Sequence, residues 1–159
     1  MDQLLPLAKQ VADKLIARGD TIAVAESSTG GLISAALLAV PGASAYYRGG
    51  MVIYTPKARA AVAQLSKEDM NGMRGATEPY ASLLAARARD QLAATWGLSE
   101  TGASGPSGNR YGDPSGHSCM AIAGPVMQVV TLETGDSDRI RNMHAFAAHA
   151  LRLLDEALG

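Results

Sequence analysis

Apolar side chains recur along the chain at two spacings, and these spacings separate predicted helices from predicted strands. Over residues 4–18 they recur every three or four positions, which predicts a helix that ends at Gly19. Residues 21–25 form a short apolar run rich in strand formers, which predicts a buried strand. The same criteria predict further helices over residues 32–40, 56–64, 78–96 and 139–158, and further strands over 46–54, 118–123 and 126–132.

The order of these elements predicts an α/β fold. Helices separate the early strands, whereas the last two strands are nearly adjacent, so we expect a three-layer α/β/α sandwich with a mixed sheet. The chain has 159 residues, about the length of one domain, and we expect residues 1–159 to form a single domain. The hydrophobic fraction of 47% excludes a globally disordered chain.

Composition narrows the classes of partner and compartment. Lys and Arg number 14 against 15 Asp and Glu, so the chain lacks the basic surplus that nucleic-acid binding uses. Cys119 is the only cysteine, which excludes an intrachain disulfide framework and a multi-cysteine zinc site. No signal-peptide pattern appears, and no apolar run approaches the ~18 residues of a membrane span. We therefore expect a soluble, cytoplasmic protein without nucleic-acid or membrane partners.

The strongest candidate for chemistry is the polar, glycine-bearing segment of residues 26–31, between a predicted strand and a predicted helix. Backbone N–H groups at a helix start bind phosphate or carboxylate, or stabilise an oxyanion beside a serine. An ordinary helix cap is the alternative interpretation, since Ser and Thr are favoured caps. The segment is neither a Walker P-loop nor a nucleophile elbow, so an attacking serine here needs a separate base.

Three further segments carry candidate groups. Tyr54, Lys57 and Arg59 stand where a strand leads into a helix, although a solvated helix start has the same composition. Residues 102–116 are dense in Gly, Pro and Ser, which permits close backbone approach to a ligand. Arg141, one turn into the last predicted helix, is placed to hold a phosphate, with helix capping as the other interpretation of its segment.

Taken in order, these segments form a more specific pattern. The series Ala-Glu-Ser-x-Thr-Gly-Gly, Tyr-x-x-x-Ala-(Lys/Arg), Thr-Gly-x-x-Gly-Pro-x-Gly, Pro-x-Gly and Gly-Asp-x-Asp-x-x-Arg resembles the CinA C-terminal domain family. The resemblance covers essentially the whole chain, which looks like the standalone kind of member. It implies an α/β/α domain that hydrolyses nicotinamide mononucleotide to nicotinate mononucleotide and ammonia, in pyridine nucleotide salvage and NAD metabolism.

The resemblance also implies roles for particular residues. Ser27 falls on the family's nucleophile, Tyr54 on its tyrosine, and Arg59 on its catalytic lysine. Because arginine keeps its proton, Arg59 can stabilise an oxyanion or hold phosphate but cannot act as a general base. Lys57 is the nearest other cation, about 200° round a helix from Arg59. Backbone N–H groups near Thr29 and Gly30 are expected to hold the oxyanion.

The resemblance also implies ligand contacts and partners, and the chain departs from the family's pattern in one loop. The expected substrate-binding residues are Glu26, Thr29, Gly30, Gly31, Thr101, Gly105 and Arg141. No metal or cofactor is implied, and the family's tendency implies a homo-oligomer that binds a small nucleotide. The family's Lys-Pro-x-Gly begins here with Asp113, an anion in place of a cation, whereas Arg110 in the same loop offers a new cation.

Two other functions stay open at this stage. Arg59 in the lysine position favours a catalytically silent relative that binds a pyridine nucleotide or another phosphorylated metabolite. A scaffold that assembles through its alanine-rich helices is the third interpretation. Loss of ammonia release on Ser27→Ala separates the enzyme from the other two.

Overall fold

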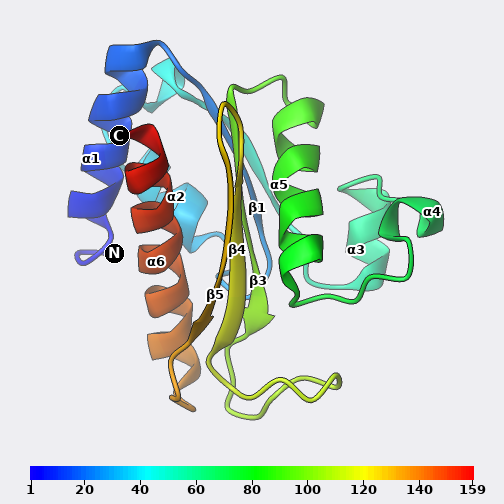
Figure 1. Ribbon diagram of the computed structural model, residues 1–159. Coiled ribbons are helices and arrows are strands. Elements are labelled where there is room, and N and C mark those ends of the chain that lie inside the picture. The colour runs from blue at the N-terminus through cyan, green and yellow to red at the C-terminus, as the bar shows by residue number, and fades with distance from the viewer.

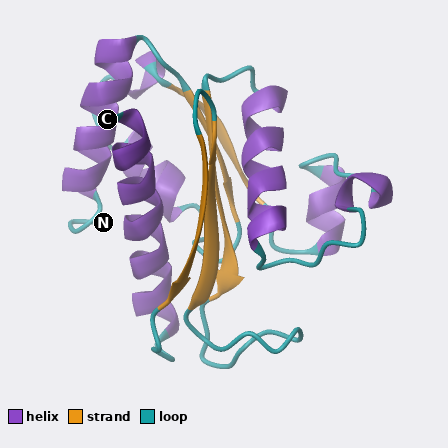
Figure 2. Ribbon diagram, viewed as in Figure 1, coloured by secondary structure: helices purple, strands orange, loops and turns teal.

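A five-stranded sheet forms the middle layer of the protein in the computed structural model, which describes residues 1–159 (Figures 1 and 2). Its strands are β1 (Ile22–Glu26), β2 (Tyr47–Val52), β3 (Trp96–Ala103), β4 (His117–Ala123) and β5 (Met127–Glu133). They lie in the order β2-β1-β3-β4-β5. β1 runs parallel to β2 and β3, and β4 runs antiparallel to β3 and β5. The predicted α/β fold with a mixed sheet is confirmed.

Helices cover both faces of the sheet. One face carries α1 (Leu5–Arg18), α2 (Leu32–Leu38) and α6 (Arg139–Leu158) (Figure 1). The other carries α5 (Glu78–Gln91), with the short helices α3 (Pro56–Ala61) and α4 (Lys67–Met70) beyond it (Figure 1). A 3-10 turn, η1 (Ala43–Ala45), leads into β2. No helix is both long and apolar enough to cross a membrane.

The two faces pack with side chains of different size. Under α1, α2 and α6 lies the larger cluster, of 22 buried residues, which includes Trp96 and Phe146. Under α5 small residues such as Ala81 and Ala85 let the helix approach the sheet closely. Gly97 of β3 marks the tightest point, because a Cβ there would lie 1.9 Å from the Ala85 carbonyl oxygen. A glycine at this position is therefore required for α5 to pack on β3.

The central strand β3 is the strand that the sequence patterns did not predict, and the short helix α4 was not predicted either. The helix predicted over residues 78–96 is wrong at its end, because α5 stops at Gln91 and Trp96 begins β3. The loop predicted from residue 102 likewise begins only after Ala103. β3 carries polar side chains that find buried partners: Ser99 Oγ, for example, donates to the Ala81 carbonyl oxygen at 2.6 Å. Such a strand lacks the apolar run that identified the other buried strands.

The topology gathers the candidate segments at one edge of the sheet. β1, β2 and β3 are parallel, so their carboxyl ends lie together. The segments that follow them are residues 27–31, 53–55 and 104–116, and the last of these extends beyond the sheet at this edge (Figure 1). Ligands of open α/β sheets commonly bind at such an edge.

Candidate functional site

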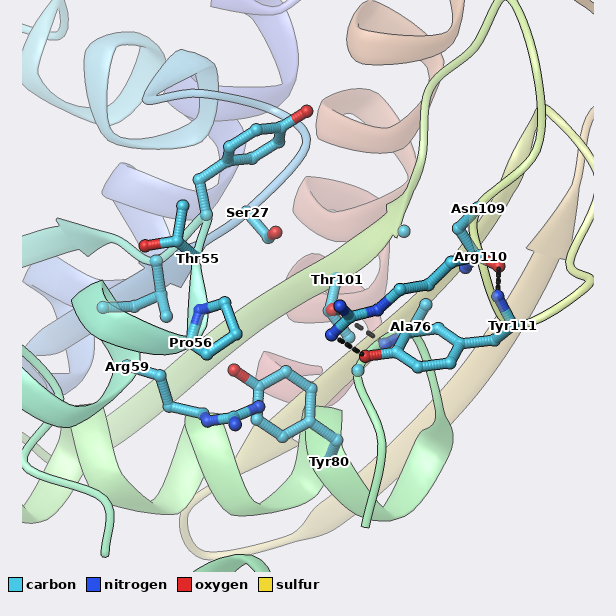
Figure 3. Close-up of a pocket in the computed structure, with 14 residues that line it drawn as sticks. Ser27, Thr55, Pro56, Arg59, Ala76, Tyr80, Thr101, Asn109, Arg110 and Tyr111 are labelled. Atoms are coloured by element: carbon cyan, nitrogen blue, oxygen red, sulfur yellow. Dashed lines mark hydrogen bonds between the residues drawn. The ribbon is translucent and has the colours of Figure 1, made fainter. Parts of the chain in front are cut away.

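A cavity of about 320 Å³ lies at this edge, and we call it the Ser27 cavity (Figure 3). Five segments of the chain form its wall. Its lining comprises Ser27, Ile53, Tyr54, Thr55, Pro56, Arg59, Gly75, Ala76, Tyr80, Thr101, Gly102, Asn109, Arg110 and Tyr111. The fold therefore brings Ser27 into one cavity with Tyr54, Arg59 and Thr101, as the sequence analysis expected.

A second cavity of about 250 Å³ adjoins the first, and we call it the glycine-loop cavity. The two cavities share Tyr54, Gly102 and Asn109 in their linings. The other residues of the second lining are Ser28, Ala103, Ser104, Gly105, Ser107, Gly108 and Arg139. Together the two cavities form one extended hollow beside Ser27 and Ser28.

Behind Ser27 lies a fully buried carboxylate, that of Glu100 on β3. Its Oε2 accepts hydrogen bonds from the backbone N–H groups of Ser27 at 3.2 Å and Thr29 at 2.9 Å. Its Oε1 accepts from Ser118 Oγ at 3.0 Å and from Ser28 Oγ. A buried charge is stable only when its hydrogen-bonding capacity is met, and here the Ser27 loop meets it. Glu100 thus fixes the backbone that carries Ser27.

Glu26 is the second buried carboxylate of this region. Its oxygens accept from the backbone N–H groups of Ile33 and Ser34, each at 2.9 Å, so it caps the start of α2. The Thr29 hydroxyl lies between the two acids, 2.8 Å from Glu26 Oε1 and 2.9 Å from Glu100 Oε2. Glu26 and Thr29 therefore hold the loop from behind and do not line either cavity.

These contacts correct the expected oxyanion site at the start of α2. The Thr29 N–H is bonded to Glu100, and the Gly30 N–H is bonded to the Ser27 carbonyl oxygen at 3.2 Å. The protein's own carboxylate thus occupies the backbone position predicted for a ligand anion. Gly30 and Gly31 also lie outside both linings; their φ values of 63° and 103° serve the turn into α2.

The expected catalytic side chains divide into three inside the cavity and one outside. The Ser27 hydroxyl lines the cavity and makes no hydrogen bond within the protein, and Arg59 lies 5.7 Å from the centroid of the Tyr80 ring. The Tyr54 hydroxyl accepts from Arg139 Nη2 at 3.2 Å. Lys57 is exposed and absent from both linings, because regular helix α3 directs it away from the Arg59 side.

The remaining predicted contacts also differ in position. Thr101 is buried in the wall of the Ser27 cavity, and its Oγ1 accepts from the Ala76 N–H at 3.1 Å. Gly105 lines the glycine-loop cavity with a φ of 106°, where a Cβ would lie 2.2 Å from Ser115 Oγ. Arg141 lies outside both cavities. It binds Asp136 through Nε at 2.8 Å and Nη2 at 3.0 Å.

That ion pair has a clear electrostatic consequence. The Arg141 guanidinium holds the pKa of Asp136 well below its usual range. The arginine that reaches the hollow is Arg139, which donates to the Gly105 carbonyl oxygen at 2.5 Å as well as to Tyr54. Sequence reasoning missed Arg139 and Glu100. A charged residue beside Thr-Gly was a usable signal for Glu100, whereas nothing in the sequence separated Arg139 from Arg141.

His117 fixes another part of the cavity wall. Its Nε2 lies 2.8 Å from the Ala76 carbonyl oxygen and its Nδ1 lies 2.5 Å from Glu133 Oε1. Because both ring nitrogens face acceptors, this geometry suits the doubly protonated imidazolium. Burial lowers the pKa of His117, but the bonds to Glu133 and Ala76 and the charge of Asp113 outweigh it, so the pKa is raised. The bond from the His117 ring to the Ala76 carbonyl oxygen therefore holds Ala76 in place.

Comparison with known proteins decides the family. The profile of the CinA C-terminal domain matches residues 4–158. The chain belongs to the CinA C-terminal domain family. It is 40% identical over 154 residues to a CinA-like protein of Anaeromyxobacter sp. (strain K), a match that covers 96% of this chain and 37% of the relative. A CinA-like protein of Gloeobacter violaceus is 41% identical over 119 residues, covering 75% and 28% of the two chains.

This CinA-family domain thus spans 37% and 28% of the length of these two curated relatives. Two solved structures match this chain over nearly the whole length of both proteins. The competence-damaged protein (CinA) superfamily protein from Enterobacter cloacae is 26% identical with a TM-score of 0.90, covering 98% of this chain and 92% of that one. The competence/damage inducible protein CihA from Agrobacterium tumefaciens is 28% identical with a TM-score of 0.87, covering 98% and 94%.

Proposed function

We propose that this CinA-family domain is an amidohydrolase that converts nicotinamide mononucleotide and water to nicotinate mononucleotide and ammonia. Ser27 is the nucleophile. The observation that carries the proposal is the Ser27 hydroxyl, which opens into a cavity lined by three tyrosines and by arginines without carboxylate partners. The family resemblance supplies the substrate.

The composition of the lining suits both ends of this substrate. Nicotinamide mononucleotide has a cationic pyridinium ring at one end and a phosphate at the other. The rings of Tyr54, Tyr80 and Tyr111 offer faces that attract a cationic ring. Arg59 and Arg110 offer charge and N–H donors to a phosphate or an oxyanion. No carboxylate lines either cavity to compete for these arginines.

The reaction follows from the groups at hand. Ser27 Oγ attacks the amide carbon, and its proton passes through the Tyr54 hydroxyl or a cavity water to the departing nitrogen, which leaves as ammonia. Arg59 stabilises the oxyanion, because the Thr29 and Gly30 N–H groups are already bonded within the protein. Water then cleaves the acyl ester, which yields the carboxylate and restores the Ser27 hydroxyl.

Glu100 orients the nucleophile and does not take its proton. Glu100 contacts the Ser27 backbone N–H, whereas the hydroxyl that it binds belongs to Ser28. Lys57 lies outside the lining, so Tyr54 is the titratable group that adjoins both cavities on the Ser27 side.

One observation favours a second candidate function, nucleotide binding without turnover. Arg59 stands on the family's lysine position, and no basic group is bonded to the Ser27 hydroxyl. A domain of this kind keeps the tyrosines and arginines for ligand binding and lacks the proton acceptor. The two candidates share the same cavity and differ only in turnover.

The test is ammonia release from nicotinamide mononucleotide by the purified protein. Ser27→Ala is the decisive variant, and Ser82→Ala is the matched control, because Ser82 is a half-buried serine of α5 outside both linings. We expect release from the wild type and the control and at least a thousandfold loss in Ser27→Ala. Equal release from Ser27→Ala would contradict the assigned nucleophile. Ligand binding without any release would establish the second candidate.

A further inference from the structure

The arginines of the protein fall into two groups according to their partners. Arg18, Arg74, Arg87, Arg89 and Arg141 each form an ion pair with an aspartate. Five arginines have no carboxylate partner, and three of them, Arg59, Arg110 and Arg139, line the Ser27 cavity or the glycine-loop cavity, whereas Arg48 and Arg152 lie outside both. Three cations without an internal counterion thus lie around the hollow, where they favour an anionic ligand.

Arg110 uses few of its donors within the protein, and unlike Arg59 it is carried by the 104–116 loop. Its one hydrogen bond within the protein runs from Nη2 to the Tyr111 hydroxyl at 2.9 Å, and its guanidinium lies 5.0 Å from the centroid of the Tyr111 ring. Figure 3 shows the side chain reaching from its loop over the cavity toward Thr101. Since a guanidinium has five N–H groups, a planar pair of donors stays available for a phosphate.

The loop that carries Arg110 is held by a network of hydrogen bonds. Asn109 Oδ1 accepts from the backbone N–H groups of Tyr111 at 3.0 Å and Asp113 at 3.1 Å. Arg74 binds Asp113 through two bonds, at 2.6 Å and 3.1 Å. The Arg74 guanidinium also lies 5.0 Å from the Tyr111 ring centroid. Arg110 is therefore presented by a braced loop, which lowers the entropy lost on binding.

Asp113, the anion that replaces a cation of the family's pattern, belongs to this brace. Its carboxylate pairs with Arg74 and is absent from both cavity linings. The Arg74 guanidinium beside it lowers the pKa of Asp113, so the pair stays ionised. The charge that the loop offers to the cavity is consequently that of Arg110 alone. Relative to the family's pattern, the loop carries the anion Asp113 in place of a cation, and it presents the cation Arg110 to the cavity.

We propose that Arg110 is the residue that binds the phosphate monoester of the substrate, and that Asn109, Asp113, Arg74 and Tyr111 are its positioning residues. The substrate identity rests on the proposed function, whereas the anion site rests on the cavity itself. The proposed reaction assigns Arg59, on the family's lysine position, to the oxyanion. Arg139 is already bonded to the Gly105 carbonyl oxygen and the Tyr54 hydroxyl. Arg110 is the cation that remains for the phosphate.

The test measures binding by calorimetry in the Ser27→Ala background, where substrate is not consumed. The ligands are nicotinamide mononucleotide, nicotinamide riboside, which lacks the phosphate, and ribose 5-phosphate, which lacks the ring. We expect Arg110→Gln to weaken both phosphate-bearing ligands about tenfold and to change riboside binding by less than about twofold. Arg110→Lys is expected to be intermediate, because an ammonium cannot bind a phosphate bidentately.

Arg48→Gln is the matched control, since Arg48 is an exposed arginine of β2 without an ion pair and outside both linings. It should leave all three affinities unchanged. Equal weakening of the mononucleotide and the riboside by Arg110→Gln overturns the proposal, as does unchanged binding of both phosphate-bearing ligands. Failure of both phosphate-bearing ligands to bind the Ser27→Ala protein overturns it as well.

The outcomes separate this inference from the proposed reaction. Arg110-dependent binding of ribose 5-phosphate, with no ammonia release by the wild type, supports the anion site and removes the amidohydrolase. Ser27-dependent ammonia release, with phosphate discrimination unchanged in Arg110→Gln, supports the reaction and removes Arg110 from the phosphate site.

Discussion

The two sides of the Ser27 cavity differ in whether their charged groups have partners within the protein. On the side of β1 and β3, the carboxylates of Glu26 and Glu100 are fully buried and are surrounded by backbone and hydroxyl donors. On the side of α3 and the 104–116 loop, Arg59 and Arg110 face the cavity with only tyrosines as partners. The charges on the first side are satisfied by hydrogen bonds within the protein, whereas the charges on the second side are available to a ligand.

This difference separates two tasks that a binding cavity must perform. A side whose hydrogen bonds are all met holds a reacting group in a fixed position, because any movement leaves a buried charge unpaired. A side with unpaired cations binds an anion and loses little when it is empty, because water solvates exposed guanidinium groups. Variants on the first side should therefore change stability, and variants on the second should change affinity or rate.

The largest expected effect is that of Glu100→Ala, which removes a buried carboxylate on the β1 and β3 side of the cavity. Removal of the buried carboxylate leaves the N–H groups of Ser27 and Thr29 without partners, so we expect the free energy of unfolding to fall by about 3 kcal/mol. Urea denaturation measures this. Glu100→Gln keeps the shape and one acceptor oxygen and should lose less. Glu68→Ala, at an exposed glutamate of α4, is the control, and equal midpoints for it and Glu100→Ala would contradict the comparison.

Arg59→Lys tests the open side. Lysine can lose its proton where arginine cannot, so the variant gains a base in the Ser27 cavity, and we expect kcat for ammonia release to rise about tenfold at pH 9. The rate should increase with pH, as the ammonium deprotonates. The control is Lys57→Arg, outside the lining, which should leave kcat unchanged. A lower rate in Arg59→Lys at every pH would show that the guanidinium itself is required.

The pH dependence of stability tests the brace at His117. The raised pKa of the folded state means that charged His117 contributes stability fully below its unfolded pKa of about 6.5. This contribution is lost as pH rises through the raised pKa. Urea midpoints of the wild type should therefore fall over that interval, relative to those of His117→Gln. Parallel pH profiles for the two proteins would show that His117 is neutral in the fold.

The smallest expected effect is that of Arg141→Gln. Arg141 is paired with Asp136 outside both cavities, so its removal should change the affinity for nicotinamide mononucleotide by less than about twofold. Arg139→Gln is the informative counterpart, because Arg139 lines the glycine-loop cavity and holds Tyr54. A titration in which Arg141→Gln weakened binding more than Arg139→Gln would reverse the assignment made from the geometry.

Much of the fold and part of the site were predictable from residue patterns. The helical stripe of residues 4–18 became α1, and residues 21–25 became most of β1, because apolar periodicity records which face is buried. The motifs around Ser27, Tyr54 and Arg59 indicated a shared site, and the structure brings these three side chains to one cavity. Periodicities and motifs of this kind depend only on residues that are close together in the sequence.

Partners distant in the sequence were decided only by the tertiary structure. Glu100 binds the Ser27 N–H across 73 positions, a contact that gives a polar side chain of the central strand β3 a buried partner. The choice between Arg139 and Arg141 likewise depended on how α6 approaches Gly105. Periodicity reports burial, whereas the partner of a buried polar group depends on the folding of the whole chain. The sequence by itself determined the layers and the motifs, and the tertiary structure decided which charges are met inside the protein and which are left for a ligand.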